Sequence, residues 1–333
     1  MKLNSKKELI AITILVILTA IPIALSLTRT ISDTQDTKEN IIWNSKGNQW
    51  KLSGNNIQTA IDDLDGGMVW VGGDVDLSDP IYLKDHVTIN FLNNRVYLQE
   101  DEPFVQVEDC VGATIKNVGV EGVSNQTAPM IKLYTAPGSN ASVSHNTFKN
   151  IQVYNGGPWT PLTEPYPNGW DNYNYDAILM EVHSGEMNNN EFQWLYLDGG
   201  TTAIHLKMPG NEGVAEHNYF ENIWIRWFTN QIWFEVAPSA QGFNYNIFSH
   251  VKSQSNWRTE YGTRDISGKG NHFEHILWWD WYLPDSTGYA TCEWCITEQA
   301  DNTHICAHII SSGYCTDNST STTFCNNQGS VCT

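Results

Sequence analysis

Basic residues are scarce in this chain. Lysine and arginine together number 18, against 37 aspartate and glutamate residues, so the formal net charge is −19. Nucleic acids and anionic membrane surfaces would repel such a chain, so neither is an expected partner. Two explanations of the acidity stay open. One is solubility in a salty external medium, and the other is recognition of cations, or of an anionic polymer through bridging calcium.

Three motifs of well-known enzyme chemistries are also absent. The sequence has no Gly-rich phosphate loop, no Gly-x-Ser-x-Gly elbow and no His-Glu-x-x-His. These motifs supply the phosphate cradle, the strained nucleophile and the paired zinc ligands of their respective reactions. Phosphoryl transfer, serine hydrolysis and zinc proteolysis are therefore disfavoured.

One long apolar run is present, at the N-terminus. Lys2, Lys6 and Lys7 precede an uncharged stretch over residues 9–27. A positive start before an apolar stretch is typical of a secretory signal, and cleavage near Ser26 is one alternative. The other is a retained anchor, because the run is nearly long enough to span a bilayer. Either alternative for residues 1–27 places the rest of the chain outside the cytoplasm, secreted or tethered to the cell surface.

Cysteine is almost absent before the C-terminal segment 290–333. Cys110 stands alone and is expected to be a buried, inert thiol. In an exported segment, the other six cysteines predict up to three disulfides of undetermined pairing. An alternative is a metal site built on Cys292-x-x-Cys295 with a nearby His or Cys. The six residues are Cys292, Cys295, Cys306, Cys315, Cys325 and Cys332.

One sequence pattern, Asn-x-Phe-x-x-aliphatic, recurs five times. Its copies are 44, 28, 28 and 25 residues apart. Between copies lies a second apolar alternation, at 178–182, 204–208 and 232–236, which is typical of a strand with one buried face. Two different short strands in each repeat leave no room for a covering helix. The copies begin at Asn146, Asn190, Asn218, Asn246 and Asn271.

A solenoid of stacked coils satisfies this pattern. Each coil would pair its strands in parallel with those of the next coil, about 4.8 Å away. Phe192, Phe220 and Phe248 would then lie in one internal file. The recurring Asn suits a bend, where its side chain can bond along the stack to backbone groups that the bend leaves unpaired.

The segment before the repeats predicts the start of such a coil. The apolar residues of 56–64 fall on one helical face and stop at Gly66, so a short amphipathic helix is expected there. That helix could cover the open end of the coil, which otherwise exposes unpaired strand edges. Segments 87–89, 113–115 and 131–133 are expected to be strands of the first coils.

The segment from Asn56 through Val71 and Gly73 resembles the N-terminal cap and first strand of the pectate-lyase-like superfamily, and the Asn-x-Phe coils are similar to its rungs. The likeness spans 53–310. It implies an all-β chain, a right-handed parallel β-helix with a short N-terminal capping helix and a Cys-rich C-terminal cap over 290–333. Residues 28–52 would be a linker and lead-in. That fold hosts lyases, hydrolases, epimerases, tailspikes and inert surface proteins, so the resemblance leaves the activity open.

The catalytic signatures of that superfamily are missing. The polygalacturonase-like branch carries Asn-Thr-Asp, Asp-Asp, Gly-His-Gly and Arg-x-Lys on consecutive coils, and this set has no counterpart here. The pectate-lyase branch pairs an Arg or Lys base with carboxylate-bound calcium. Lys207 or Arg226 could imitate that base. The resemblance then makes Glu181, Asp198 and Glu235 candidate calcium ligands, although no local motif matches.

Alignment of the coils places outward side chains in columns. Glu181, Lys207 and Glu235 form one column of alternating charge, next to a column that holds His205 and Trp233. A surface salt-bridge ladder explains the first column, since each cross-strand pair contributes roughly 0.2–1 kcal/mol. The alternative is a carbohydrate site. In it the charged column is catalytic, and His205 and Trp233 bind substrate.

A third column pairs Asp198 with Arg226 across adjacent coils, and the same two alternatives apply to it. Arg226, with Trp224 nearby, is a further candidate for substrate binding. An exposed Trp offers a flat apolar face with a polar rim, which suits the face of a sugar ring.

The longest coil carries an insertion over residues 156–175. Long loops on a regular scaffold are often functional, although its prolines and aromatic residues could also simply pack it onto the coil. Asp171 within it and Asp176 after it are candidate catalytic carboxylates. Its candidate sugar-binding residues are Trp159, Tyr166, Trp170, Tyr173 and Tyr175.

Two classes of function follow from the sequence. The first is an exported protein that binds polysaccharide and cleaves it as a lyase or glycoside hydrolase. The second is a non-catalytic structural or adhesin protein of the cell surface. Neither requires a cofactor, and calcium is the one candidate. Potential glycosylation acceptors at Asn125, Asn140 and Asn318 agree with export.

Overall fold

Strands make up nearly all of the described structure, with α2 (Gly54–Asp62) as the one helix among the described residues. The computed structural model describes residues 40–154, 175–255, 261–280, 292–301, 303–309, 315–317 and 322–324. These strands belong to one unit, Ile41–Thr333. The prediction of an all-β chain is confirmed.

The first strands are short, and several later strands run through a bend. The strands before residue 190 are β1 (Ile41–Asn44), β2 (Gln49–Lys51), β3 (Gly67–Val71), β4 (Val75–Leu77), β5 (Ile81–Tyr82), β6 (Val87–Leu98), β7 (Val105–Glu108), β8 (Thr114–Glu121), β9 (Ile131–Thr135), β10 (Thr147–Tyr154), β11 (Asp176–Val182) and β12 (Ser184–Glu186). The later strands are β13 (Glu191–Met208), β14 (Glu212–Glu216), β15 (Tyr219–Val236), β16 (Phe243–Asn244), β17 (Ile247–Ser249), β18 (Lys252–Ser255), β19 (Tyr261–Lys269), β20 (His272–Asp280), β21 (Cys292–Asp301), β22 (His304–Ile309), β23 (Cys315–Asp317) and β24 (Thr323–Phe324).

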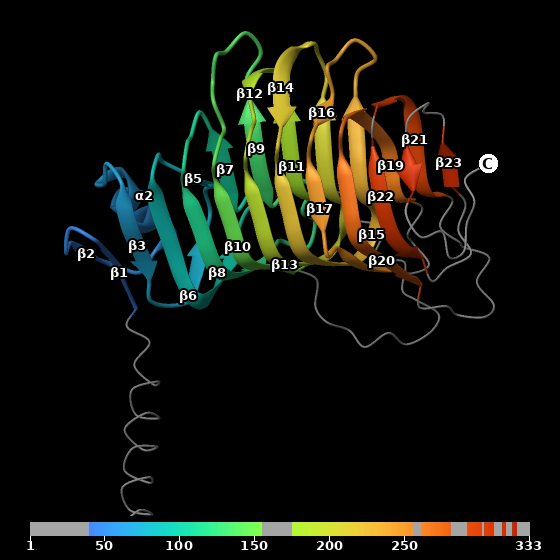
Figure 1. Cartoon of the computed structure of the whole chain (residues 1–333). Helices are drawn as coiled ribbons and strands as arrows, with labels where there is room; N and C mark the ends of the chain where they lie inside the picture. Colours follow the sequence, from blue (N-terminus) through green and yellow to red (C-terminus); the bar gives the residue numbers. More distant parts are fainter. Residues whose placement is uncertain are drawn as a thin grey trace, which may run out of the picture. The chain divides into compact units, whose positions relative to one another are not determined.

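The strands stack in parallel in long series (Figure 1). One series runs β6, β8, β10, β13 and β15, and a second runs β5, β7, β9, β11, β13 and β15. β13 and β15 belong to both series because each bends partway along its length. A separate small sheet joins β12, β14 and β16. The arrangement is compatible with a solenoid of successive coils.

The predicted internal file of phenylalanines is confirmed. Phe192 lies opposite Phe220, and Phe220 lies opposite Phe248. Their rings stack nearly parallel, with centroids 4.8 and 4.6 Å apart. Phe148 and Phe273 extend the file at its two ends, and all five rings are fully buried. The file is the centre of the apolar core.

The predicted role of the recurring asparagines is also confirmed. The Nδ2 of each donates to the Oδ1 of the next, at 3.1, 3.0, 3.0 and 3.1 Å from Asn146 through Asn271. Most also donate to a backbone carbonyl, as Asn218 does to Met187. The amides are buried, so this ladder pairs polar groups that the bend would otherwise leave without partners.

A bend in each coil uses a residue in the left-handed region. The residue two positions after each Phe of the file has a positive φ, whether it is Asn150, Trp194, Asn222, His250 or His275. That conformation costs a non-glycine residue about 1 kcal/mol and is easiest for Asn. The Asn150 Nδ2 donates to the Asn117 Oδ1 at 2.9 Å, so a second, shorter amide ladder lines this corner.

The N-terminal cap is more ordered than the sequence predicted. The expected helix forms, with Ser53 as its N-cap and Ile57, Ala60 and Ile61 buried. The segment expected to be a linker, 28–52, contains β1 and β2. β1 pairs antiparallel with β3 and covers the edge of the parallel stack.

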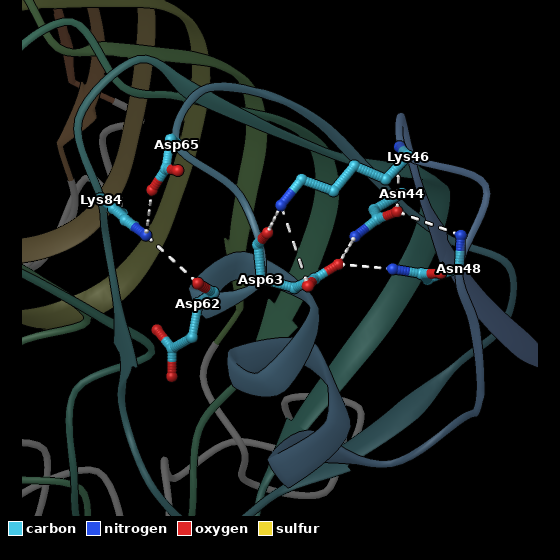
Figure 2. A network of polar contacts seen from close by, with 7 residues as sticks. All are labelled: Asn44, Lys46, Asn48, Asp62, Asp63, Asp65 and Lys84. Atoms are coloured by element: carbon cyan, nitrogen blue, oxygen red, sulfur yellow. Dashed lines mark hydrogen bonds and ion pairs between the residues drawn. The ribbon is translucent and has the colours of Figure 1, made fainter.

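A network of polar contacts fastens this cap (Figure 2). The Oδ2 of Asp63, the C-cap of α2, accepts from the Nδ2 atoms of Asn44 and Asn48 at 2.9 and 2.7 Å. The Lys46 ammonium donates to the backbone carbonyl of Asp63. Lys84 lies 3.4 Å from the Oδ1 of Asp65. The β1–β2 turn is therefore clamped onto the end of the helix.

Cys110 is buried, as predicted, with an exposure of 1%. Burial, and then the nearby carboxylate of Asp85, raises the pKa of the Cys110 thiol to about 12. The thiol is inert at neutral pH because only the thiolate is a nucleophile.

The C-terminal prediction is tested only at the level of the backbone. Parallel pairing continues through β23 and β24, beyond residue 310, where the coils were expected to end. The side chains of Cys292, Cys295, Cys306 and Cys315 lie outside what the structure describes, and so do residues Cys325 and Cys332. The disulfides therefore stay a prediction.

The N-terminal segment 1–27 also lies outside the described residues. Among the residues that are described, no helix has the length and apolar character needed to cross a bilayer. Whether residues 1–27 form a signal or an anchor stays a prediction.

Candidate functional site

Six residues that the sequence singled out lie together on the outer face of β11, β13 and β15. The register places Leu179 beside His205 and His205 beside Trp233, and the neighbouring row is Glu181, Lys207 and Glu235. Strand alternation explains the two rows, because Ile204, Leu206 and Met208 point into the core, and Asp176 at the start of β11 joins them through its contact with His205. We call this group the His205 platform: Asp176, Glu181, His205, Lys207, Trp233 and Glu235.

His205 is held between two carboxylates. Its Nδ1 lies 2.7 Å from the Oδ2 of Asp176, and its Nε2 lies 3.0 Å from the Oε2 of Glu235. The contact between Nδ1 and Oδ2 is a hydrogen bond whose donor depends on the imidazole tautomer. The Nε2 contact is close but not aligned as a hydrogen bond. Asp176, His205 and Glu235 thus form a line of close contacts with the imidazole at its centre.

Glu235 is the end of this line that is most exposed to solvent. The His205 side chain is 7% exposed and that of Asp176 is 20% exposed, whereas that of Glu235 is 45% exposed. A ligand on this face would therefore meet Glu235 before His205. The role of His205 as a substrate contact stays a prediction.

Trp233 holds the imidazole in place. Its ring stacks on His205 with centroids 4.4 Å apart and 8° between the planes. The Arg264 guanidinium lies over the Trp233 ring, 4.3 Å from its centroid. The predicted role of Trp233 as a platform for a sugar needs correction, because neighbouring side chains cover its ring.

Lys207 lies between the two glutamates of its row. Its Nζ is 3.6 Å from the Oε1 of Glu181 and 4.0 Å from the Oε2 of Glu235, so those two oxygens are at most about 7.6 Å apart. The Nε2 of His183 lies 3.2 Å from the same Oε1 of Glu181. The predicted ladder of alternating charge is confirmed, and both of its carboxylates belong to one cluster.

Asp198, Arg226 and Trp224 lie elsewhere. Asp198 precedes the bend of β13, and the register places it beside Arg226, with 3.9 Å between its Oδ2 and the Arg226 Nη1. Tyr196 and Trp224 occupy the next row of that surface. The structure therefore does not bring Asp198 to Glu181 and Glu235, so these three do not form one calcium site. Among the described residues no group of His, Cys, Asp and Glu suits a metal ion.

Tyr175 is not on the surface. It is fully buried, its hydroxyl donates to the Asp198 carbonyl at 3.3 Å, and its ring packs edge-on against Phe228. A fully buried ring offers no face to a sugar in this structure, and it packs into the coil immediately before β11. The remaining loop candidates lie outside the described residues: Trp159, Tyr166, Trp170, Asp171 and Tyr173.

Sequence reasoning missed four residues around the platform. His183 contacts Glu181, and Arg264 covers Trp233. On β9, the Lys132 ammonium lies 4.7 Å from the ring centroid of Tyr134, whose edge contacts His183 at 5.6 Å between centroids. Extending the outward columns by one coil in each direction would have found Lys132, Tyr134 and Arg264.

Comparisons of the chain with protein-family models, with curated proteins and with solved structures return no match. The geometry and chemistry of the surface therefore carry the functional argument.

Proposed function

We propose that the chain is an exported right-handed parallel β-helix of the pectate-lyase type that binds a polysaccharide across the His205 platform and hydrolyses its glycosidic bonds. The single observation that supports this most is the line Asp176–His205–Glu235. It joins a buried, oriented imidazole to a half-exposed carboxylate. A second carboxylate, that of Glu181, lies across Lys207.

Hydrolysis of a glycoside needs two carboxyl groups in different roles. One gives a proton to the oxygen that leaves C1, and the other takes a proton from the attacking water, so one water is added across the C1–O bond. We assign the acid to Glu235, whose side chain is 45% exposed against 17% for Glu181, so that it is the carboxyl that a bound polymer meets first. We assign the base to Glu181, which lies across Lys207 from it.

The separation of the two glutamates fits this chemistry. Retaining hydrolases hold their carboxyls about 5 Å apart and inverting ones about 6.5–9.5 Å apart. The upper limit of about 7.6 Å between the Lys207-facing oxygens lies within reach of either class. Lys207 would move off one glutamate to contact the sugar.

Cations on and beside the platform favour an acidic polysaccharide. Lys132, Lys207 and Arg264 are partly exposed and come from different coils, although the whole chain is strongly acidic. Lys132 and Arg264 lie in the His205 row and Lys207 lies in the neighbouring row, so cations recur along the stack where a chain of uronate or sulfated sugars would lie. Export agrees with this class of substrate, because such polymers are extracellular.

The test uses the purified protein with a panel of neutral and acidic polysaccharides, and it measures new reducing ends and unsaturated products separately. Hydrolysis predicts reducing ends without unsaturation. Glu235→Gln and Glu181→Gln should each lower the rate by about 10²–10⁴-fold, because each removes a proton-transfer group. Glu191→Gln, at an exposed position of another surface, is the matched control and should leave the rate unchanged.

One observation favours a second candidate, a non-catalytic binder. Lys207 contacts both glutamates, and such a column of alternating charge is also what a purely structural ladder would show. Retention of a polysaccharide without any product, in wild type and in both Gln variants, would establish the binder and exclude the enzyme. Unsaturated products would instead indicate a lyase.

A further inference from the structure

A second outer surface, on the part of β13 and β15 before their bends, carries a different kind of side chain. Its rows run across β6, β8, β10, β13 and β15. One row reads Gly119, Gln152, Tyr196 and Trp224, and Arg95 precedes Gly119 in it. None of these residues belongs to the His205 platform.

A hollow of about 200 Å³ lies at one end of this surface. It exists because Gly119 has no side chain between those of Arg95 and Gln152. The hollow is smaller than the roughly 300–1,000 Å³ of typical small-molecule sites, so it is a shallow depression and not a full ligand pocket. Its walls offer amide, guanidinium and phenol groups, from Asn93, Arg95, Asn150, Gln152 and Tyr154.

Aromatic rings continue from the hollow along the stack. Tyr154 lies 5.8 Å from Tyr196, and Tyr196 lies 5.5 Å from Trp224, between ring centroids. Trp224 is 49% exposed, which is unusual for a large aromatic side chain. We call Tyr154, Trp194, Tyr196 and Trp224 the aromatic strip.

Tyr196 is held firmly within the strip. Its hydroxyl donates to the Oδ2 of Asp198 at 3.2 Å and accepts from the Arg226 guanidinium. Burial, and then the charge of Asp198, raises the pKa of Tyr196, so the phenol stays neutral. A ring fixed in this way loses little freedom when a ligand packs on it.

Trp194 is the most unusual residue of the strip. It occupies the bend where neighbouring coils have Asn150 and Asn222, and its φ is 58°. Its side chain is 58% exposed. The bend imposes the left-handed conformation on every coil, so what distinguishes Trp194 is the large exposed ring at a position where Asn is easiest. An exposed aromatic ring of this size is available for binding a ligand.

We propose that this surface is a second carbohydrate site, which holds an oligosaccharide with one sugar ring in the hollow and further rings along the aromatic strip. Aromatic faces stack on sugar rings, and the amides at the hollow suit ring hydroxyls. Coils repeat about every 4.8 Å, which is close to the length of one sugar residue, so successive sugar rings can contact the side chains of successive coils. This site is distinct from the His205 platform, and its function is to bind the oligosaccharide and not to cleave it.

Other ligands fit less well. The chain's net charge of −19 disfavours nucleic acid, which could otherwise stack on such rings. The polar walls of the hollow disfavour a purely apolar ligand. A site that holds one stretch of a polymer while the platform acts on another would raise the effective concentration of substrate.

The test measures retention of the full-length protein on an array of neutral and acidic oligosaccharides. Trp224→Ala should weaken retention by about tenfold, the value of one well-packed aromatic contact. Gly119→Val should abolish it by filling the hollow. A Cβ at Gly119 would lie 3.6 Å from both the Arg95 Cγ and a ring carbon of Tyr154, which is an ordinary contact distance, and an unchanged unfolding midpoint checks that the variant keeps the fold. Tyr82→Ala is the matched control, since Tyr82 is 47% exposed on another strand and should not matter.

Trp194→Asn separates binding from folding, because it restores the residue type of the neighbouring bends. Weaker retention together with an unchanged or higher unfolding midpoint supports the proposal. The variant should release reducing ends from a soluble substrate at the wild-type rate. Failure of the proposed hydrolysis would appear in this rate, whereas failure of the proposed binding site would appear in retention. Retention by no sugar of the array, or equal retention of wild type, Trp224→Ala and Gly119→Val, overturns the proposal.

Discussion

Asp198 is a carboxylate whose surroundings penalise its charge. Its side chain is 16% exposed, and burial raises its pKa, although the Arg226 guanidinium and the Tyr196 hydroxyl oppose that shift. A raised pKa means that the folded state favours the neutral acid. The stability that this group contributes is therefore present below its unfolded pKa and lost as pH rises through its folded pKa.

We expect Asp198→Asn to change the free energy of unfolding at neutral pH by less than about 1 kcal/mol, because the amide keeps the hydrogen bond to Tyr196 without the buried charge. Arg226→Met should cost about 3 kcal/mol, since it leaves that carboxylate without its cation. Urea denaturation measures both. On acidification, wild type should gain stability relative to Asp198→Asn. A large loss in Asp198→Asn at neutral pH would contradict the assignment.

At the scale of elements, the sequence predicted the strands that recur in successive coils, but it did not predict the bends between them. Asn-x-Phe identified the strands that begin at residues 147, 191 and 219, because identical buried environments select identical residues in successive coils. The left-handed bend two residues after the Phe left only a weak signal. Asn150 and Asn222 are residues that favour such a bend, but Trp194 is not. A Trp within a strand pattern would be predicted to be buried, whereas the Trp194 side chain is exposed.

The candidate site shows the same division. The register of Glu181, Lys207 and Glu235 followed from alternation alone. The side-chain contacts did not follow, since they depend on distances within the stack. Trp233 was expected to face a sugar, but His205 and Arg264 cover its ring. Tyr175 was expected to belong to an exposed loop, but it is fully buried and lies immediately before β11.

The N-terminal cap is an element whose hold on the stack depends on pH. Hydrogen bonds from Asn44, and then from Asn48, lower the pKa of Asp63. A lowered pKa gives stability that is present above the unfolded pKa and lost as pH falls through the folded pKa. We expect Asp63→Ala to raise amide hydrogen exchange in β1 and β2 at neutral pH while β13 and β15 stay protected. Asp65→Ala removes only the contact of a 98% exposed side chain with Lys84 in the same network, so it is the control and should raise exchange much less (Figure 2).

At the scale of the whole molecule, the amide ladder runs through the coils from Asn146 to Asn271 and joins each of them only to its neighbours. Asn218 donates to Asn246 and to the Met187 carbonyl, and it accepts from Asn190. A stack of this kind is stabilised by the sum of neighbour contacts, so damage to one internal coil weakens the link between the two parts of the stack.

We therefore expect Asn218→Ala to destabilise the protein by about 3 kcal/mol, the cost of leaving buried polar groups without partners. The damage lies between two parts of the stack, so the denaturant slope of unfolding should also fall as one part opens before the other. Asn55→Ala, on the exposed side of α2, should change neither the midpoint nor the slope. If Asn218→Ala also left both unchanged, the ladder would be a consequence of the stacking and not one of its causes.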